Sequence, residues 1–197
     1  MEMLPPPIRK RKRVFVTCVN TLVEAPPVIN HVHDFIQHLR EYVRDRDLPV
    51  EVIELVPEVE QTFWVNLIGR GYPTPVREFR WCTDRMKVRP SQKFIEDNVE
   101  IFGSPPVVHF LLGTRYDESA ARTATMETHT NLGTDIHHHG TIPTAGVIRP
   151  IEDWPTDYVW DYLLRREWGD GGQNPFREIN QTLAVLYRDA ASGECPV

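Results

Sequence analysis

The sequence predicts an α/β protein with a mostly parallel open sheet and helices on both faces of that sheet. Strand-like runs alternate along the chain with stretches whose apolar residues recur at helical spacing. The connections between these segments are short, and a β–α–β order of this kind implies parallel strands with right-handed crossovers. A third observation is the apolar run at 107–112, which breaks at Gly113 into a charged turn, as a buried strand does where it leaves a sheet.

The N-terminal part of the chain contains one complete β–α–β unit. The β-rich run 14–19 predicts a first strand, and 50–55 predicts a second. Between them, apolar residues recur at helical spacing through 28–43, and Pro27 suits the first turn of a helix. These elements predict two parallel strands joined by one helix.

The middle of the chain predicts shorter elements. We expect a short helix around 61–68, a glycine- and proline-punctuated loop at 69–75, and a further helix over 91–98. The strand at 107–112 and a helix from Glu118 form the next strand–helix unit.

The last third of the chain begins with a polar stretch rich in glycine and histidine at 127–144, which predicts a long loop or lid. Residues 147–148 predict a short edge strand, and 156–166 predict an amphipathic helix. A final helix is expected over 174–191, opened by Pro175.

The composition is that of an ordinary globular protein, with 41% hydrophobic and 25% charged residues among 197. We expect a basic, proline-rich arm at 1–12 and one domain over 13–197. The formal net charge of −6 argues against a surface that coats nucleic acid, so contact with DNA would need a local basic patch or a partner. The basic run Arg9–Arg13 is interpreted as a solvated arm that leads into the first strand.

The three cysteines are widely spaced and odd in number, which does not indicate a disulfide framework. No apolar segment approaches the ~20 residues of a membrane span. The N-terminus also lacks the apolar core of a secretory signal peptide. We therefore expect a reducing, cytoplasmic setting without a membrane partner.

The charged turn that follows Gly113 contains groups suited to anion binding. The cluster 117–119 favours a helix start, so Arg115 and Arg122 would flank a helix N-terminus. Guanidinium groups match phosphate or sulfate geometry, which predicts an oxyanion of a nucleotide or a sulfur carrier as the ligand. The same spacing also fits a capped surface helix with an i,i+4 ion pair between Glu118 and Arg122, and both interpretations stay open.

Several stretches of the sequence resemble the phosphoadenosine phosphosulfate reductase family. Residues 113–122 resemble its Gly-x-Arg-x-x-Glu-Ser-x-x-Arg motif, and residues 80–87 resemble its Cys-Thr-x-x-x-Lys segment. The stretches 20–24, 62–73 and 186–196 narrow the resemblance to the DndC branch. These are the sulfurtransferases of DNA phosphorothioate modification, which replace a non-bridging phosphate oxygen of the DNA backbone by sulfur. The resemblance covers most of the chain and implies an adenine nucleotide alpha hydrolase-like fold of the ATP-pyrophosphatase type.

The sequence departs from the pattern of this family at both ends. The family's phosphate-binding loop, Ser-Gly-Gly-x-Asp-Ser, precedes the strand that matches 14–19, and the sequence contains no such loop. Members of the branch also carry a cysteine cluster, thought to hold an iron–sulfur centre, after the segment that matches 193–196. We therefore expect an incomplete central portion of such an enzyme, which holds no iron–sulfur cluster by itself.

The resemblance assigns roles to residues at the carboxyl ends of the predicted strands, where an open parallel sheet binds its ligands. The nucleotide-binding positions that it implies are Asn20, Thr21, Glu24, Arg85, Lys87, Gly113, Thr114 and Ser119. The catalytic positions that it implies are Cys82, Arg115, Glu118 and Arg122. In this scheme the two arginines hold phosphate oxygens and Cys82 relays sulfur. No metal ligands are assigned.

Asn20 stands where the family usually has an aspartate that faces the adenosine. Asparagine keeps the shape but loses the charge, which would weaken recognition of the ribose or the adenine. The alternative is an Asx-type turn at Asn20 that closes the strand without any ligand.

Cys82 is the strongest candidate for a reactive thiol. Arg80, Arg85 and Lys87 lie close to it in sequence, and neighbouring cations favour the nucleophilic thiolate form of a cysteine. Cys18 lies in an apolar strand and is interpreted as a buried filler. By the resemblance, Cys195 would neighbour the cysteine cluster of complete family members.

The implied function is ATP-dependent sulfur transfer to the DNA backbone, with ATP and Mg²⁺ as cofactors. In this reaction ATP activates a phosphate oxygen as an adenylate, which a sulfur species then displaces. The implied partners are other DNA phosphorothioation proteins, including a cysteine desulfurase. Two alternatives stay open: a non-catalytic module that binds a nucleotide or a partner, which Asn20 favours, and a phosphoadenosine phosphosulfate reductase acting on a small molecule, which the stretch 62–73 argues against.

The histidines show no recognisable metal-site spacing. Three consecutive residues such as His137–His139 rarely face one ion, so this run is interpreted as a solvated loop. His31, Asp34 and His38 share one side of the predicted helix and are interpreted as a polar helix face rather than a zinc site. The aromatic residues at 154–162 are interpreted as packing of a helix onto the sheet.

Overall fold

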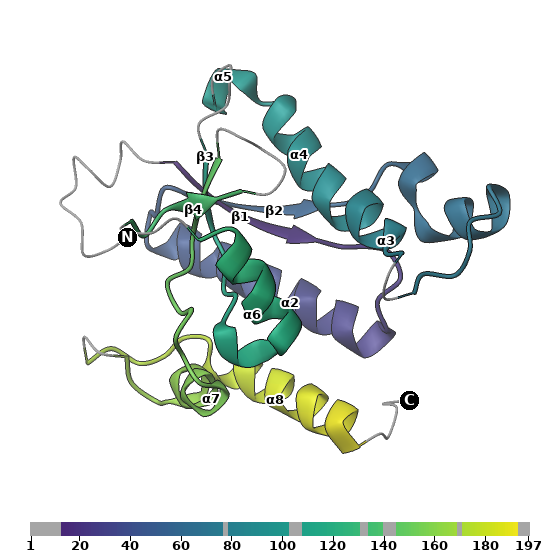
Figure 1. The fold of residues 1–197 in the computed structure, drawn as a ribbon. Helices are drawn as coiled ribbons and strands as arrows, with labels where there is room; N and C mark the ends of the chain where they lie inside the picture. Colours follow the sequence, from purple (N-terminus) through teal and green to yellow (C-terminus); the bar gives the residue numbers. More distant parts are fainter. Residues whose placement is uncertain are drawn as a thin grey trace. The chain divides into compact units, whose positions relative to one another are not determined.

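Parallel strands alternate with helices in a computed structural model of the chain, which confirms the predicted α/β class (Figure 1). The structure describes residues 13–76, 79–102, 108–130, 134–139, 145–168 and 171–192. The arm expected at 1–12 and Cys195 lie outside these residues. The sequence analysis expects one domain, whereas the chain divides into two compact units: 1–93 with 166–197, and 94–165. Each unit contains its own sheet.

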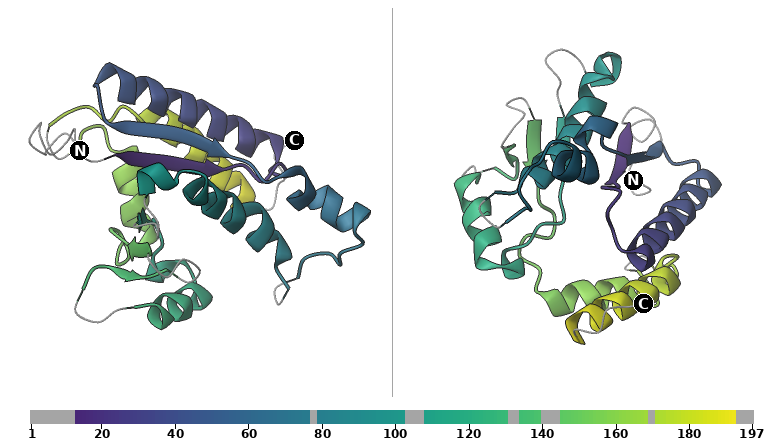
Figure 2. Two further views of the ribbon diagram at one scale, coloured as in Figure 1. Left: turned by 90° about the horizontal axis from the view of Figure 1, so that it is seen from above. Right: turned by 90° about the vertical axis from the view of Figure 1, so that its right-hand side faces the viewer.

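The first unit contains the predicted β–α–β arrangement. β1 (Val14–Val19) and β2 (Val50–Leu55) pair in parallel, with the first residues of the two strands opposite each other and the last residues likewise. The connecting helix, α2 (Pro26–Asp45), has proline in its first turn, where the missing N–H group needs no partner within the helix. Figure 2 shows α2 running along the β1–β2 pair. Both strand predictions are confirmed to the residue.

Aromatic packing joins α8 (Arg177–Ser192) to α2. The ring centroid of Phe176, just before α8, lies 5.7 Å from that of Phe35 and 5.2 Å from that of Tyr42. His38 approaches the same ring edge-on, and its Nε2 lies 2.7 Å from the carbonyl oxygen of Pro175, where it donates a hydrogen bond. The helix therefore begins just after Pro175, close to the predicted start.

The polar helix face expected on α2 is wrong for two of its three members. His31 is buried, and burial lowers its pKa below the usual value, although Asp34 partly opposes this change. His38 contacts Pro175 and Phe176 rather than water. The periodic pattern predicted the helix but could not predict that α8 covers part of this face.

A segment between β2 and the end of the first unit forms several short helical turns. These are η1 (Val59–Gln61), η2 (Val65–Gly69), α3 (Trp81–Thr83), η3 (Asp84–Val88) and α4 (Arg89–Glu96), of which η2 and η3 are π-helical. The last three are continuous, so the helix expected over 91–98 begins earlier than predicted. By the resemblance, Cys82, Arg85 and Lys87 would lie in a loop, but the structure places them in this helical stretch. Burial of Trp81 anchors the start of the helix, and its Nε1 donates to the carbonyl of Pro73 at 2.9 Å.

The second unit contains a three-stranded sheet in the order β3–β5–β4. β3 (Val108–Leu111) is parallel to β5 (Ala145–Ile148), and β4 (His137–His138) is antiparallel to β5. The predicted edge strand is therefore central among the described strands, and the prediction is wrong. Gly146 permits this arrangement, since a Cβ there would lie only 2.5 Å from a methyl group of Ile136 and 3.1 Å from the ring of His109.

The helices of the second unit include α5 (Val99–Phe102), η4 (Tyr116–Glu118), α6 (Ala120–Thr128) and α7 (Thr156–Leu164). The long loop expected over 127–144 is interrupted, because α6 continues into it and β4 lies within it; 131–133 and 140–144 are outside the described residues. His137 is buried, and the ring of His139 stacks on Phe110 at 4.8 Å between centroids. The solvated run expected there is therefore wrong for these two histidines.

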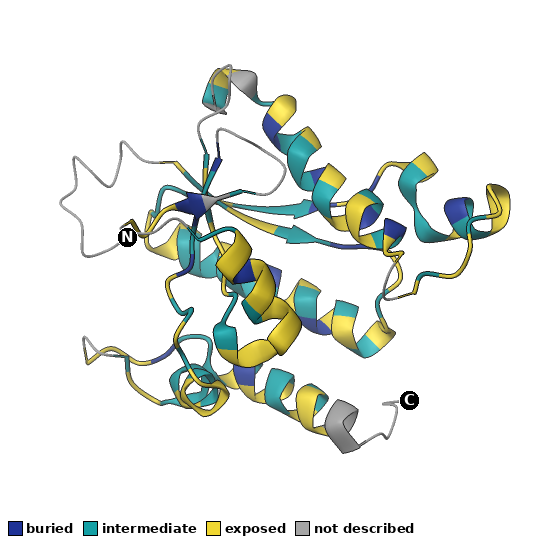
Figure 3. Cartoon of the chain, viewed as in Figure 1, coloured by how far each residue is buried: buried dark blue, intermediate teal, exposed yellow. Residues whose placement is uncertain are grey.

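The buried residues marked in Figure 3 form a small core in each unit. In the first unit the buried apolar residues include Ile36 and Leu55, and in the second they include Met126 and Val147. None of the described helices combines the length and the apolar character needed to cross a lipid bilayer.

We expect Phe176→Ala to lower the free energy of unfolding by about 2–4 kcal/mol, because it removes the ring that joins α8 to α2 and leaves a cavity. Equilibrium urea denaturation followed by circular dichroism measures this loss. Tyr187→Ala is the matched control on the same helix, since Tyr187 is 63% exposed and its removal should change stability little. Equal losses in the two variants would contradict the role assigned to Phe176.

Candidate functional site

Five polar residues form a cluster at the carboxyl ends of β1 and β2. This strand-end cluster consists of Asn20, Thr21, Glu24, His33 and Glu54. Asn20 and Thr21 are buried, and Nδ2 of Asn20 donates to Oε1 of Glu54 at 2.8 Å. Nε2 of His33 lies 3.3 Å from the same carboxylate oxygen. The cluster thus joins the ends of both strands to α2.

The turn at 20–24 directs several donors toward one carboxylate. Glu24 accepts from the Thr21 hydroxyl at 2.6 Å and from the backbone N–H groups of Thr21 and Val23, each at 3.3 Å. Oδ1 of Asn20 accepts from the N–H of Leu22 at 2.9 Å, which is the Asx-type turn that the sequence analysis gave as one alternative. Leu22 adopts the left-handed conformation, with φ of 64°. Successive N–H groups of this kind can bind an anion, and here the Glu24 side chain itself occupies them.

Hydrogen bonds keep both carboxylates of the cluster ionised. The bond from Asn20 lowers the pKa of Glu54, and His33 adds to this effect despite partial burial. For Glu24, burial raises the pKa, but the bonds from Thr21 and the backbone together lower it below the usual value. Burial and the two nearby carboxylates raise the pKa of Cys18. This thiol is therefore protonated at neutral pH, in keeping with its interpretation as a filler.

The chemistry of the strand-end cluster is that of a hydrogen-bond acceptor. Two carboxylates at the end of a parallel pair can accept from the hydroxyls of a ribose or the amino group of a base. They cannot themselves attract a phosphate, because they carry negative charge. The cluster is therefore suited to a group that donates hydrogen bonds and not to a phosphate.

The sequence analysis missed two members of the cluster, His33 and the more buried Glu54. Glu54 faces Cys18 across the parallel ladder, so it lies at the same end of the sheet as Asn20. The sequence could have indicated Glu54 through the predicted β–α–β unit, because two parallel strands of equal length end side by side.

The second group of predicted residues lies on the helical stretch that begins at Trp81. Cys82 is half-buried and free. The guanidinium of Arg85 donates to the hydroxyl of Tyr72 at 2.6 Å and also to the side chain of Gln61. Lys87 is exposed. Arg85 is thus held by residues of the preceding segment, while the Lys87 ammonium faces solvent.

The predicted residues at 113–122 lie in the second unit, around the start of α6. Nε of Arg122 pairs with Glu118 at 3.0 Å, and Ser119 caps α6 by accepting from the N–H of Arg122 at 3.2 Å. This is the capped helix with an i,i+4 ion pair that the sequence analysis kept as one interpretation.

Arg115 joins the turn after β3 to the start of α7. Its Nη1 donates to the carbonyl of Trp154 at 3.0 Å and contacts the hydroxyl of Thr156 at 3.3 Å. Asp117 lies 3.7 Å from the same group and accepts from the N–H of Thr156 at 2.9 Å, so it caps α7. Bonds from Thr156 lower the pKa of Asp117, with the Arg115 charge adding to them.

The glycine expected to form a tight turn is not required to do so. Gly113 has no left-handed φ, and a Cβ at this position would meet Ile151 at an ordinary 3.6 Å. Thr114 is half-buried beside it. The turn is held instead by Leu112, whose N–H donates to the carbonyl of Ile148, and by the bonds of Arg115.

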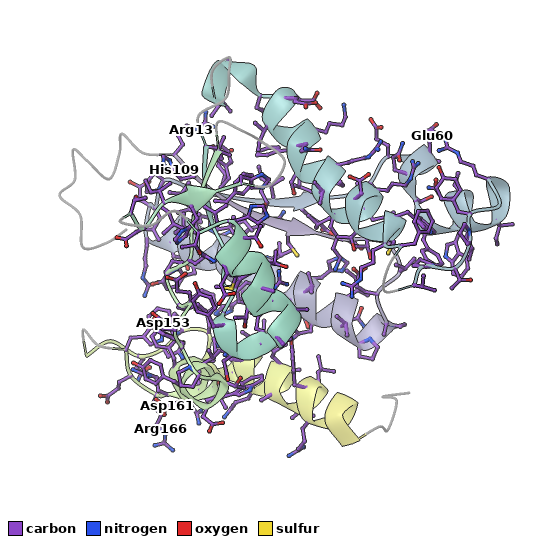
Figure 4. The ribbon with its side chains drawn as sticks, viewed as in Figure 1. Arg13, Glu60, His109, Asp153, Asp161 and Arg166 are labelled. Atoms are coloured by element: carbon purple, nitrogen blue, oxygen red, sulfur yellow. The ribbon has the colours of Figure 1, made fainter. Side chains whose placement is uncertain are left out.

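The second unit also contains a buried ion pair that sequence reasoning did not find. Arg149, whose side chain is only 4% exposed, lies with its Nε 3.0 Å from Glu152. Its Nη2 donates to the Thr130 hydroxyl, and His137 lies 3.8 Å from the same carboxylate. The N–H of Tyr116 donates to the Glu152 backbone, so this pair connects β4, β5 and η4. Figure 4 labels His109, which lies opposite Gly146 of β5 in the same sheet.

No group of three or more histidine, cysteine, aspartate or glutamate side chains that could hold a metal ion occurs among the described residues. The cysteines described, Cys18 and Cys82, do not provide the four thiolates of an iron–sulfur centre. The described part of the chain does not fit such a cluster.

The chain is an α/β protein with a cluster of polar side chains at the carboxyl end of a parallel β–α–β unit. No protein-family model matches the sequence. The chain is similar to an uncharacterized protein of Methanocaldococcus jannaschii, with 29% identity over 156 residues. The matched region covers 79% of this chain and 27% of that relative, so the chain spans about a quarter of the relative's length.

We expect the first unit to lose stability as the pH falls below the ordinary glutamate value of 4.5. Folding lowers the pKa of Glu24 and Glu54, so the unfolded chain binds more protons at these carboxylates than the folded chain does. Their contribution to the free energy of unfolding is complete above pH 4.5 and is lost as the pH falls through the lowered pKa values of the folded state. Urea midpoints at about pH 7 and about pH 4 measure this change.

Glu54→Gln should reduce this acid sensitivity. Glu51→Gln is the control on the same strand, since that carboxylate is 52% exposed and should leave the sensitivity unchanged. An identical pH dependence in wild type and Glu54→Gln would contradict the stabilising role of the cluster.

Proposed function

We propose that the strand-end cluster binds the nucleoside portion of an adenine nucleotide, and that the chain takes part in ATP-dependent sulfur transfer to the DNA backbone. The observation that supports nucleotide binding is the pair of ionised carboxylates, Glu24 and Glu54, oriented by Asn20 and Thr21 at the end of a parallel strand pair. The resemblance of 62–73 to DndC sulfurtransferases, together with that of 113–122 to the phosphoadenosine phosphosulfate reductase family, supports the reaction class.

In the proposed reaction a non-bridging phosphate oxygen of DNA attacks the α-phosphorus of ATP, and pyrophosphate leaves. A sulfide-level sulfur nucleophile then displaces AMP from the DNA phosphorus. Glu54 and Glu24 would accept hydrogen bonds from the ribose or adenine and so orient the substrate ATP, whose Mg²⁺ travels with its phosphates. Cys82 would accept sulfane sulfur from the persulfide of a cysteine desulfurase partner, in a cytoplasmic setting. A thiol reductant, itself oxidised to a disulfide, would supply the two electrons that release this sulfur at the sulfide level.

A second candidate is a non-catalytic binding module, and a specific observation favours it. The guanidinium groups proposed to hold phosphate already have partners within their own unit: Glu118 for Arg122, and Trp154 with Thr156 for Arg115. Phosphate binding would have to compete with these contacts. A module that holds a nucleoside or a partner without turnover would leave them unchanged.

Isothermal titration calorimetry with AMP, and with ATP and magnesium, tests the shared element of both candidates. We expect the wild-type chain to bind AMP and Glu54→Gln to weaken binding by about tenfold or more, because a charge-assisted hydrogen bond is lost. Glu51→Gln, the control on the same strand, should bind as the wild type does.

Pyrophosphate release from ATP in the presence of DNA separates the two candidates. Turnover that depends on Arg115 supports the sulfurtransferase, whereas AMP binding without turnover supports the module. A wild-type chain that binds neither nucleotide would refute the sulfurtransferase and the nucleotide-binding form of the module.

A further inference from the structure

An exposed aromatic side chain projects from the segment between β2 and α3. Trp64 is 58% exposed and Ile68, one helical turn later, is 75% exposed. Tryptophan side chains are seldom this exposed. A single exposed apolar residue needs no explanation, but two apolar side chains one helical turn apart form a patch. We call Trp64, Ile68, Arg70 and Arg80 the Trp64 patch.

The Trp64 ring is held rigidly from below. It meets Phe63 edge-on at 5.1 Å, and Phe63 stacks on the buried Trp81 at 5.5 Å with 21° between the ring planes. The ring centroids of Tyr72 and Trp81 lie 5.4 Å apart in an edge-to-face arrangement, and the guanidinium of Arg85 lies over the Tyr72 ring. Aromatic contacts therefore run from the interior to an exposed ring whose orientation is set in advance.

The turn that carries Trp64 is also fixed from within. Asn66 is fully buried, and its Nδ2 donates to the carbonyls of Glu60 and Thr62 at 3.0 and 2.8 Å. Glu60 is labelled in Figure 4 at the start of this segment. The turn is π-helical, a geometry that is rare and often occurs at functional sites. A binding surface needs this kind of rigidity, because ordering a flexible side chain on binding costs free energy.

Two exposed cations lie on the same segment of the chain as this ring. Arg70 makes one long contact of 3.5 Å with Asn66, and Arg80, which immediately precedes Trp81, has no ion pair in the described part of the chain. Both side chains are exposed. In a chain with a net charge of −6, two exposed guanidiniums without an ion pair among the described residues, on the segment that carries an exposed tryptophan, suit a negatively charged ligand with flat rings.

We propose that the Trp64 patch binds single-stranded DNA, with a base stacked on Trp64 and the neighbouring phosphates paired with Arg70 and Arg80. Aromatic stacking platforms flanked by cations bind single strands in this way, and each stacked base contributes about 1–3 kcal/mol. The unpaired guanidiniums favour this ligand over a protein, because an apolar protein surface would leave them buried without partners. This inference rests on the proposed function in one respect, that DNA is the substrate of the proposed reaction. The Trp64 patch shares no residue with the strand-end cluster.

Fluorescence anisotropy of the full chain with a labelled single strand of about 20 nucleotides tests the proposal. We expect Trp64→Ala to raise the Kd by about tenfold, and Trp64→Phe to raise it less, since a smaller ring remains. Arg70→Ala and Arg80→Ala should each weaken binding and reduce the salt dependence of log Kd by about one phosphate contact. Ile68→Glu, at a fully accessible position, should also weaken binding by like-charge repulsion.

Matched controls are available on the same unit. Tyr187→Ala removes another exposed aromatic ring, and Arg44→Ala removes an arginine that is 73% exposed but paired with Asp45. Both should change the Kd by less than about twofold. Circular dichroism verifies that each variant is folded.

Three results would overturn the proposal. These are a wild-type chain that does not bind the single strand, patch variants whose Kd equals that of the wild type, and an oligomer that dissociates on Trp64→Ala, which would assign the patch to a second copy of the chain. Failure here is distinct from failure of the proposed function, which is measured by AMP binding and Glu54→Gln. A chain that binds AMP but no DNA strand refutes this inference alone.

Discussion

The hydrogen bond from Asn20 to Glu54 is the interaction on which the candidate site depends. It connects the carboxyl ends of two strands that are far apart in sequence, and it exists because the parallel ladder aligns β1 and β2 in equal register. The bond stabilises an ionised carboxylate at a half-buried position, which costs free energy unless a donor is supplied. An aspartate at position 20, as in most of the resembled family, would place two carboxylates together. Asparagine and Glu54 therefore form a matched pair in this chain.

A polar side chain can stabilise the fold and also bind a ligand, provided that it has hydrogen-bonding capacity left over. The candidate site residues of the two units differ in how much of this capacity remains. In the first unit the carboxylates of the cluster retain acceptor capacity toward a ligand, since a carboxylate can accept more bonds than Glu54 receives. In the second unit Arg115 and Asp117 are occupied with holding the start of α7. A motif read from sequence as an anion site can thus form a turn and a cap with the same side chains.

The segment around Trp81 shows how a short stretch of chain can be made rigid without a sheet. The side chain of buried Asn66 donates to the carbonyls of Glu60 and Thr62 just before the π-helical turn, and the Trp81 ring provides the apolar contact. Arg85 of η3 connects this turn to Gln61 of η1 and to Tyr72, which follows η2. This internal order is what allows exposed side chains on its surface to be oriented.

The sequence by itself determined the β–α–β unit, the strand ends at Val19 and Leu55, the proline in the first turn of α2 and the helix start at Ser119, because periodicity, proline and capping are properties of neighbouring residues. Tertiary structure decided which side chains meet. It made β5 central, buried His137, and gave Arg115 partners that lie 39 and 41 positions along the chain. Such contacts depend on how elements pack, and packing is not encoded in any local pattern of apolar and polar residues.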